Sequence, residues 1–393
     1  MLADGLRVLD WLSEVPQQSW DALLDPSASP FLEWGWLEAM ESSGCAAPPA
    51  GWRPRHLTLW RGGRLIAAAP AYAKDGSDGD FSRDWEWAAA AQRARIRFYP
   101  KLVIGVPFTP CTGRRILVAP GEDRLACAAT ILEGARALCA EESLGTLEVL
   151  FPDEEETKLL ESLGFAIRVD FQFHWTNDGY ASMDDFLARF NSKRRAMIKR
   201  ERGAAEGQGI GVRTIRGIEI ANDPIGLART TYKLHKSTID KLPWGRGWLN
   251  RAFYEKIFTR MPDKLELVVA ERAGKVIAGA FNVSSATRLY GRYWGCLEEH
   301  KFLHFNVCLY HSVNDCIERG LQVFEGGAGG EHKLSRGFQP SPTYAAFAFL
   351  DPRLDTSVRR YLEAERPERE AALIRFREES GLLKPLNKSE EAR

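Results

Sequence analysis

The chain has 393 residues, of which 45% are hydrophobic and 27% are charged, an ordinary balance for a soluble globular protein. Lys and Arg together number 53, as do Asp and Glu, so the overall charge gives no sign of a nucleic-acid partner. The length favours two domains, because a single domain usually holds about 100–200 residues.

Seven cysteines, an odd number without a Cys-x-x-Cys pair, argue against a disulfide framework or structural zinc and favour a reducing cytoplasm. The start of the chain lacks a basic segment followed by an apolar run, so we expect no signal peptide. The longest apolar runs, such as residues 66–73, are shorter than the roughly 20 residues that span a bilayer. We therefore predict a cytoplasmic protein without a membrane span, as either a monomer or a homodimer.

The first half of the chain predicts helices and then alternating strands and helices. Residues 1–50 have the amphipathic spacing of helices, with Leu6, Leu9 and Leu12 as the first example. Gly62 and Gly63 predict the turn of a hairpin. Strands are expected at residues 56–60, 64–72, 97–106, 114–118, 146–151 and 165–175, and helices at 121–141 and 153–163. This order is typical of an α/β unit.

The second half repeats the scheme. Helices are expected at residues 183–202, 224–242, 248–260, 302–318 and 352–379, the last broken at Pro367. Strands are expected at residues 209–215, 265–270, 275–283, 289–295, 321–324 and 343–350. Residues 384–393 predict a disordered tail.

An internal repeat supports two similar domains. Residues 64–72 and 275–283 share one apolar pattern, and each follows an apolar strand and a glycine turn. We therefore predict an N-terminal domain at residues 1–170 and a C-terminal domain at 171–383.

The strongest candidate site follows the strand expected at residues 321–324. A bend with four glycines leads into an acid, an imidazole, two cations and a Gly-Phe pair; the residues are Gly326, Gly327, Gly329, Gly330, Glu331, His332, Lys333, Arg336, Gly337 and Phe338. The glycines allow a sharp bend and close approach to a ligand. We predict that Glu331 and His332 exchange protons and that Lys333 and Arg336, beside Phe338, hold a phosphate or carboxylate. The alternative is a solvent-exposed turn with salt-bridged charges.

A strand and a helix supply further candidates. Alternation places Tyr290, Arg292 and Trp294 on one strand face, where they would line either a pocket or an aromatic core. Six cations lie within residues 193–202. Such a run is either a solvated helix face or a site for phosphate or an RNA backbone, with Lys193, Arg194, Lys199 and Arg200 as its contacts.

A metal site is not expected. His300 and His304 are four residues apart, a spacing that can bind zinc on one helix. The segment lacks the glutamate of a His-Glu-x-x-His motif, because Lys301 follows His300.

Several short segments together resemble a known family. They are Ser29-Pro-Phe-Leu, Trp52-Arg-Pro-Arg-His, Asp84-Trp-Glu-Trp-Ala, Tyr99-Pro-Lys-Leu, Pro107-Phe-Thr-Pro and Gly330-Glu-His-Lys-x-x-Arg-Gly-Phe-x-Pro. Across residues 29–350 the chain resembles the FemAB-like peptidoglycan biosynthesis/recognition family of the GNAT acyltransferase superfamily. The resemblance implies an α/β fold of two tandem GNAT-like domains, each a mixed, splayed sheet flanked by helices.

The resemblance also implies an activity. The chain would move an acyl or aminoacyl group onto an amine of an anionic acceptor, such as a peptidoglycan precursor, and Asp84, Trp85 and Lys101 would join the substrate contacts. The donor would be either acyl-CoA or aminoacyl-tRNA. The glycine loop that holds the pyrophosphate of CoA is absent before the helix expected at residues 302–318, and the basic run at 193–202 resembles that of tRNA-using relatives. The alternative is a binding module that recognises a precursor or an amino-acid conjugate without catalysis.

Overall fold

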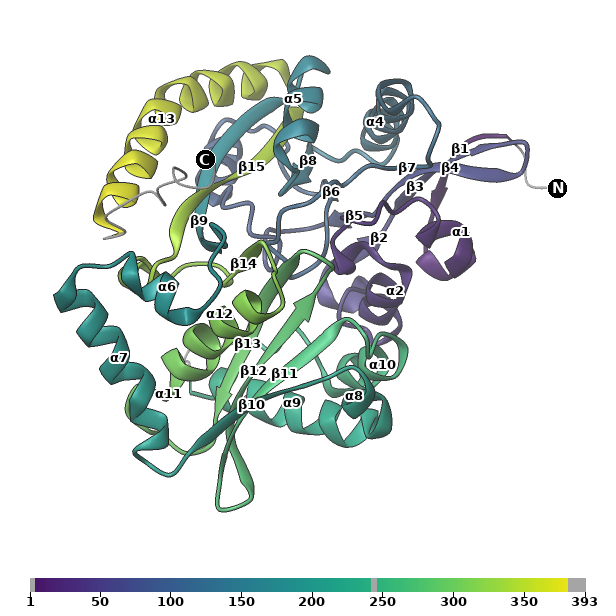
Figure 1. The fold of residues 1–393 in the computed structure, drawn as a ribbon. Helices are drawn as coiled ribbons and strands as arrows, with labels where there is room; N and C mark the ends of the chain where they lie inside the picture. The colour runs from purple at the N-terminus through teal and green to yellow at the C-terminus, as the bar shows by residue number, and fades with distance from the viewer. Residues whose placement is uncertain (1–3, 242–245, 381–393) are drawn as a thin grey trace, which may run out of the picture. The chain divides into compact units, whose positions relative to one another are not determined.

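The structure is a computed structural model that describes residues 4–241 and 246–380 (Figure 1). The chain divides into two compact units. The first comprises Met1–Asp170, Trp248–Met261 and Pro342–Glu370, and the second Phe171–Gly247, Pro262–Ser341 and Ala371–Arg393. The tail predicted at residues 384–393 lies outside the described residues.

The first unit holds an antiparallel sheet in the order β1-β3-β4-β7 and a second set of paired strands in the order β2-β5-β6-β8. The strands are β1 (Gly5–Leu9), β2 (Trp52–Pro54), β3 (His56–Arg61), β4 (Arg64–Ala69), β5 (Ala71–Lys74), β6 (Lys101–Ile104), β7 (Leu117–Val118) and β8 (Thr146–Leu150). The helices are α1 (Gln17–Asp21), α2 (Trp34–Ser42), α3 (Trp85–Arg93), α4 (Arg124–Glu141), α5 (Glu154–Ser162) and α10 (Arg251–Arg260), with short 3-10 turns at Leu12–Glu14, Pro30–Leu32 and Pro48–Ala50.

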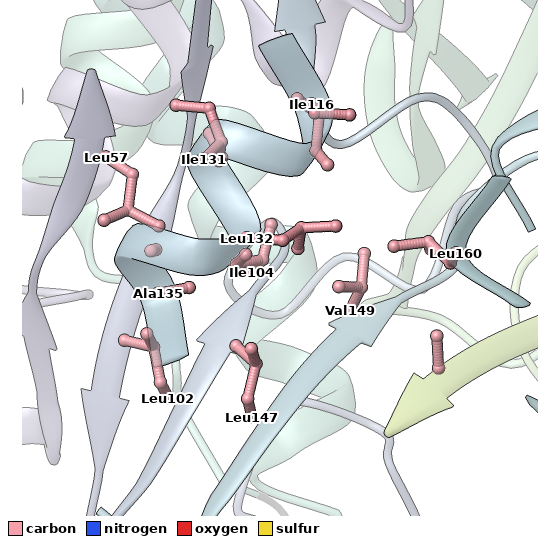
Figure 2. Close-up of a cluster of buried hydrophobic side chains, with 14 of the residues drawn as sticks. Leu57, Leu102, Ile104, Ile116, Ile131, Leu132, Ala135, Leu147, Val149 and Leu160 are labelled. Carbon is pink, nitrogen blue, oxygen red and sulfur yellow. The ribbon is translucent and has the colours of Figure 1, made fainter. Parts of the chain in front are cut away.

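The core of the first unit lies between α4 and the parallel pair β6–β8. Alternate side chains of the two strands, Leu102 and Ile104 on β6 and Leu147 and Val149 on β8, lie on the same side as Ile131 of α4 (Figure 2). Side chains on parallel strands alternate with a period of two, which is why every second residue enters this core.

The second unit is a mixed sheet with helices against it, in the strand order β10-β11-β12-β13-β14-β9. Its strands are β10 (Gly211–Arg216), β11 (Leu265–Arg272), β12 (Lys275–Ser284), β13 (Arg288–Cys296) and β14 (Val323–Glu325). Its helices are α6 (Met183–Ala188), α7 (Ser192–Glu206), α8 (Ile218–Asn222), α9 (Pro224–Ile239), α11 (Leu303–Phe305), the π-helix η4 (Asn306–Tyr310), α12 (His311–Glu318) and the 3-10 helix η5 (Glu331–Arg336). Three elements, β9 (Ala166–Thr176), β15 (Gln339–Phe349) and α13 (Pro352–Glu379), contain residues of both units.

Helices cover both faces of the sheet in the second unit. Ala278 and Ala280 of β12 pack against Val307 of η4. The intervening Gly279 faces the opposite way, since a Cβ atom there would lie 2.9 Å from Leu234 of α9. The unit is therefore a sheet flanked by helices, in which β13 and β14 are parallel and the pairs β10–β11, β11–β12, β12–β13 and β14–β9 are antiparallel.

The two repeated segments share one irregularity. In the β3–β4 hairpin the register skips Ile66, and in the β11–β12 hairpin it skips Ile277. Ile66 and Ile277 occupy the third position of the two matched segments. The freed carbonyl accepts a bond from Ala119 N–H in one unit and from Leu297 N–H in the other. A β-bulge at the matching residue gives the repeat a structural counterpart.

The helix predicted from Leu6 and Leu9 is wrong. Residues 5–9 form β1, which pairs antiparallel with β3. Leu6 packs so closely on α4 that a Cβ atom at Gly134 would overlap it. The spacing of the leucines matches that of an amphipathic helix, but the backbone of residues 5–9 makes its hydrogen bonds with β3 instead.

Two further helix predictions need correction. The helix expected at residues 183–202 is two helices, because the Asn191 side chain accepts a bond from Arg194 N–H at 2.8 Å and starts α7 afresh. The break expected at Pro367 does not occur, and α13 runs through it. Pro367 and Glu363 are exposed, so water can reach the carbonyl that loses its helical partner. Within residues 4–241 and 246–380, no helix is long and apolar enough to cross a membrane.

Candidate functional site

A cavity of about 270 Å³ lies in the second unit, where β13 and β14 separate. The two strands pair only from Arg288 to Tyr290, opposite Val323 to Glu325, although β13 continues to Cys296. The residues that line the cavity are Ala280, Asn282, Gly291, Arg292, Tyr293, Trp294, His304, Cys308, Leu309, Phe324, Gly326, Gly327, Ala328, Gly329, Gly330, His332 and Lys333.

A second β-bulge turns β13 toward the cavity. Gly291 pairs with Asn282 and Tyr293 with Phe281, so Arg292 has no opposite residue. Arg292, Tyr293 and Trp294 therefore all line the cavity. Tyr290, which the alternation placed with them, is buried in the sheet and does not reach it.

The glycine bend at residues 326–330 forms the opposite wall. Gly327, Gly329 and Gly330 have positive φ angles of 80°, 74° and 91°, a conformation that glycine adopts without strain. The ammonium of Lys333 donates to the carbonyls of Gly327 and Gly329, each at 2.8 Å. In the described part of the chain, the backbone N–H groups of residues 326–330 donate no hydrogen bond. These donors remain available to a ligand oxygen.

The four charged residues predicted in this segment lie on η5 and have different surroundings. Glu331 and His332 are both exposed, but His332 lines the cavity and Glu331 does not. Lys333 is buried, and burial lowers its pKa to about 8. Arg336 is buried, donates to both carboxylate oxygens of Glu201, and lies 3.4 Å from the ring centroid of Phe305. Both cations are thus held by the protein itself, and a role in binding substrate stays a prediction.

Phe338, the other candidate of this segment, is fully buried and packs edge-on against Phe324. Its ring lies under the glycine bend, since a Cβ atom at Gly326 would approach it to 3.0 Å. Phe338 therefore supports the cavity wall from behind.

His304 is a site residue that the sequence analysis did not identify as one. Its ring centroid lies 6.0 Å from that of His332 and 5.1 Å from Trp294. Burial, and then the charges of His332, Lys333 and Arg336, lower the pKa of His304 to about 4. Burial and the same two cations also lower the pKa of His332. Both imidazoles are therefore neutral near pH 7 and able to accept a proton.

The cavity has no carboxylate. None of its lining residues is Asp or Glu, and two of them, Arg292 and Lys333, are basic. A site with this lining favours anionic or neutral polar groups and offers two neutral imidazoles to an amine.

The candidates of the first unit lie in a buried ion cluster. Lys101 Nζ is 2.6 Å from Asp84, 2.9 Å from Glu148 and 3.0 Å from Asp80. Burial alone would lower the pKa of Lys101, but the three carboxylates outweigh it and hold the pKa above its usual range. Trp85 is 57% exposed at the start of α3. The charges of Lys101 and Asp84 are therefore paired inside the protein, while Trp85 is exposed.

The basic residues proposed for phosphate or RNA lie on α7. Lys193, Lys199 and Arg200 are exposed, and Arg194 is half-buried. Lys199 Nζ lies 3.8 Å from an Asp184 oxygen, a weak contact at the surface. Their charges remain open to a partner.

Comparisons with known proteins agree with this architecture. FemX has 13% sequence identity to the chain and superposes on it with a TM-score of 0.52. The match covers 88% of this chain and 98% of FemX. L-PGS from Bacillus licheniformis has 10% identity and a TM-score of 0.53. This match covers 88% of the chain and 95% of L-PGS. Identities this low show a shared fold and nothing more. No curated protein matches the sequence.

The predicted α/β fold class is confirmed: each of the two compact units combines paired strands with helices, and the parallel pairs β6–β8 and β13–β14 stand among antiparallel ones. A family model for peptidoglycan biosynthesis/recognition, FemAB-like, matches residues 11–383, nearly the whole chain. The resemblance expected from the short motifs is thereby confirmed. The chain belongs to the FemAB-like family of peptidoglycan biosynthesis/recognition proteins.

Proposed function

We propose that the chain is a transferase that moves an acyl or aminoacyl group onto an amine of an anionic acceptor related to peptidoglycan precursors. The observation that carries the proposal is the cavity where β13 and β14 separate, which joins two neutral imidazoles, two cations and free backbone N–H groups. Family membership supports the link to peptidoglycan.

The chemistry needs one proton acceptor and one oxyanion site. The acceptor ammonium would first release one proton to water, and the neutral amine would attack the donor carbonyl while His332 or His304 takes the second proton from its nitrogen. A C–N bond forms, the ester or thioester bond breaks, and the imidazolium returns the proton to the leaving oxygen or sulfur. The N–H groups of residues 326–330 would stabilise the tetrahedral oxyanion.

Two donors fit this scheme, acyl-CoA and aminoacyl-tRNA. The helix that follows β13 begins at Leu303 after Phe302, whose φ is 62°, and the segment before it has no glycine loop for a pyrophosphate. This supports an aminoacyl ester over acyl-CoA as the donor that we propose first.

A mass-spectrometric transfer assay tests the proposal by crossing acyl-CoA and aminoacyl-tRNA donors with a panel of amine acceptors, including nucleotide-linked peptidoglycan precursors. We expect transfer with at least one pair, and a loss of about 10²-fold or more in His332→Gln or His304→Gln. His300→Gln is the matched control, because His300 lies outside the cavity lining. If no pair of donor and acceptor gives a product, the transferase proposal fails.

The second candidate is a binding module that recognises a precursor or an amino-acid conjugate without turnover. The observation that favours it is the enclosure of Lys333 and Arg336, which are bonded within the protein. Saturable precursor binding, combined with no product from either donor, would establish this function in place of transfer.

A further inference from the structure

The second unit holds another cavity, of about 440 Å³, beside the basic helix α7. Its lining comes from α7, η4, α12 and the start of β10: Lys199, Arg202, Gly203, Ala205, Glu206, Ile210, Val212, Asn306, Tyr310, His311 and Asn314. No residue of this list lines the cavity of the candidate active site.

The π-helix η4 separates the two cavities. Cys308 and Leu309 line the first cavity, and Asn306 and Tyr310 line the second. A π-helix widens one turn and redirects side chains, and such turns are frequent at functional sites. This segment thus serves as a wall of both cavities.

The charges around the second cavity favour an anion. Lys199 and Arg202 are cationic, and Glu206 is the one acid among the lining residues. Burial lowers the pKa of His311, so its imidazole adds no charge near pH 7. In the residues that the structure describes, the Arg202 guanidinium has no hydrogen bond or ion pair. An arginine fork without a protein partner suits the two oxygens of a phosphate group.

Glu201, the next residue on α7, does not oppose this charge. Its buried carboxylate accepts from Arg336 and, at 2.5 Å, from the Tyr310 hydroxyl. Its negative charge is therefore compensated on the side of η5, and the net charge at the second cavity stays positive.

Gly203 is a position at the cavity wall where a side chain can be introduced. It lies inside α7, where glycine costs about 1 kcal/mol relative to alanine. A Cβ atom at Gly203 would meet nothing within 4 Å, and Gly203 lines the cavity. A larger side chain at this position would therefore meet no backbone clash, and leucine there tests whether the cavity wall contacts the ligand.

We propose that this cavity binds the diphosphate group of a small molecule, with Arg202 and Lys199 as its cationic contacts. The volume exceeds the need of a single phosphate, and Arg202 and Lys199 supply the charge that its oxygens need. An RNA backbone, by contrast, would also engage the exposed cations of α7 outside the cavity. The inference goes beyond the proposed transfer, because binding requires neither a donor nor turnover.

Isothermal titration of the full chain with inorganic pyrophosphate tests the proposal. We expect saturable binding that Arg202→Gln weakens by about tenfold or more and that Gly203→Leu blocks. Arg200→Gln is the matched control, since it removes the same charge from the same helix but outside the cavity, and should change the affinity by less than about twofold. Circular dichroism of each variant checks that α7 remains folded.

Three results would overturn the proposal. The first is the absence of saturable pyrophosphate binding by the native chain. The second is an equal loss of affinity in Arg200→Gln and Arg202→Gln, which indicates diffuse attraction along α7. The third is binding of a single-stranded RNA that substitution of Lys193 and Arg200 weakens and that Gly203→Leu leaves unchanged. That result would show that α7 binds RNA. None of these results depends on whether the chain transfers an acyl group.

Discussion

Arg336 and Glu201 form a buried ion pair that ties the site segment η5 to α7. Arg336 Nη2 lies 2.8 Å from Glu201 Oε2 and 3.0 Å from Oε1, and Arg336 Nε lies 3.1 Å from Oε2. The Tyr310 hydroxyl donates to the same carboxylate. Arg336 therefore acts through Glu201 to position η5.

The pair predicts that a single variant loses far more stability than the double variant. Arg336→Met leaves the Glu201 charge buried and should lower the free energy of unfolding by about 3–5 kcal/mol. The double variant Glu201→Leu, Arg336→Met should recover much of that loss, because no charge stays unpaired. Chemical denaturation measures both. Breaking the exposed pair Glu154–Lys158 is the control and should have a much smaller effect. If Arg336 instead holds substrate, Arg336→Met would keep its stability and lose acceptor affinity.

The cluster around Lys101 predicts a loss of stability that depends on pH. Lys101→Met removes the cation that contacts all three carboxylates and leaves Lys74, 4.0 Å from Asp80, as a more distant one. We expect a loss of about 3–5 kcal/mol near pH 7. The pKa values of the carboxylates would then rise, so the folded variant would bind more protons than the unfolded chain. Its deficit should therefore shrink as the pH falls toward 5. Denaturation curves of both proteins at several pH values measure this difference. A deficit independent of pH would contradict an electrostatic role.

His304 predicts a stability change in mildly acidic solution. Its folded pKa of about 4 lies below the ordinary 6.5, so between these values the unfolded chain binds more protons. The neutral imidazole thus contributes stability above pH 6.5 that is lost as the pH falls toward 4, by at most about 3 kcal/mol. The difference in unfolding free energy between pH 7 and pH 4.5 should be smaller in His304→Gln than in the native chain. NMR titration of the imidazole gives an independent value, and a pKa near 6.5 would refute the prediction.

Local patterns in the sequence predicted the hairpins, the glycine bend and the segment that supplies His332, because turns and short-range alternation depend on neighbouring residues. Contacts between distant segments leave no such pattern. Nothing near His304 indicates that it meets His332, and its spacing from His300 suggested a metal motif instead. The partners of Lys101 and Arg336 were equally hidden, since a cation in a sequence does not reveal a carboxylate far along the chain.

The β-bulge at Arg292 shows the same limit on a smaller scale. Strict alternation placed Tyr290 with Arg292 and Trp294, but the extra residue brings Tyr293 to the cavity and leaves Tyr290 in the core. A bulge depends on the pairing partner, which the strand's own residues do not specify.

The glycine bend allows a direct test of the part that His332 plays in transfer. Gly329 and Gly330 both have positive φ, so alanine at either position should cost about 1–2 kcal/mol of stability. A Cβ atom at Gly330 would lie 2.8 Å from the His332 ring, whereas one at Gly329 meets nothing within 4 Å. Gly330→Ala should therefore displace the imidazole and lower kcat about tenfold or more, while Gly329→Ala keeps kcat nearly unchanged. The transfer assay measures kcat, and the imidazole resonance of His332 reports its displacement. Equal losses of kcat in the two variants would show that the bend matters for its backbone and that His332 is not the proton acceptor.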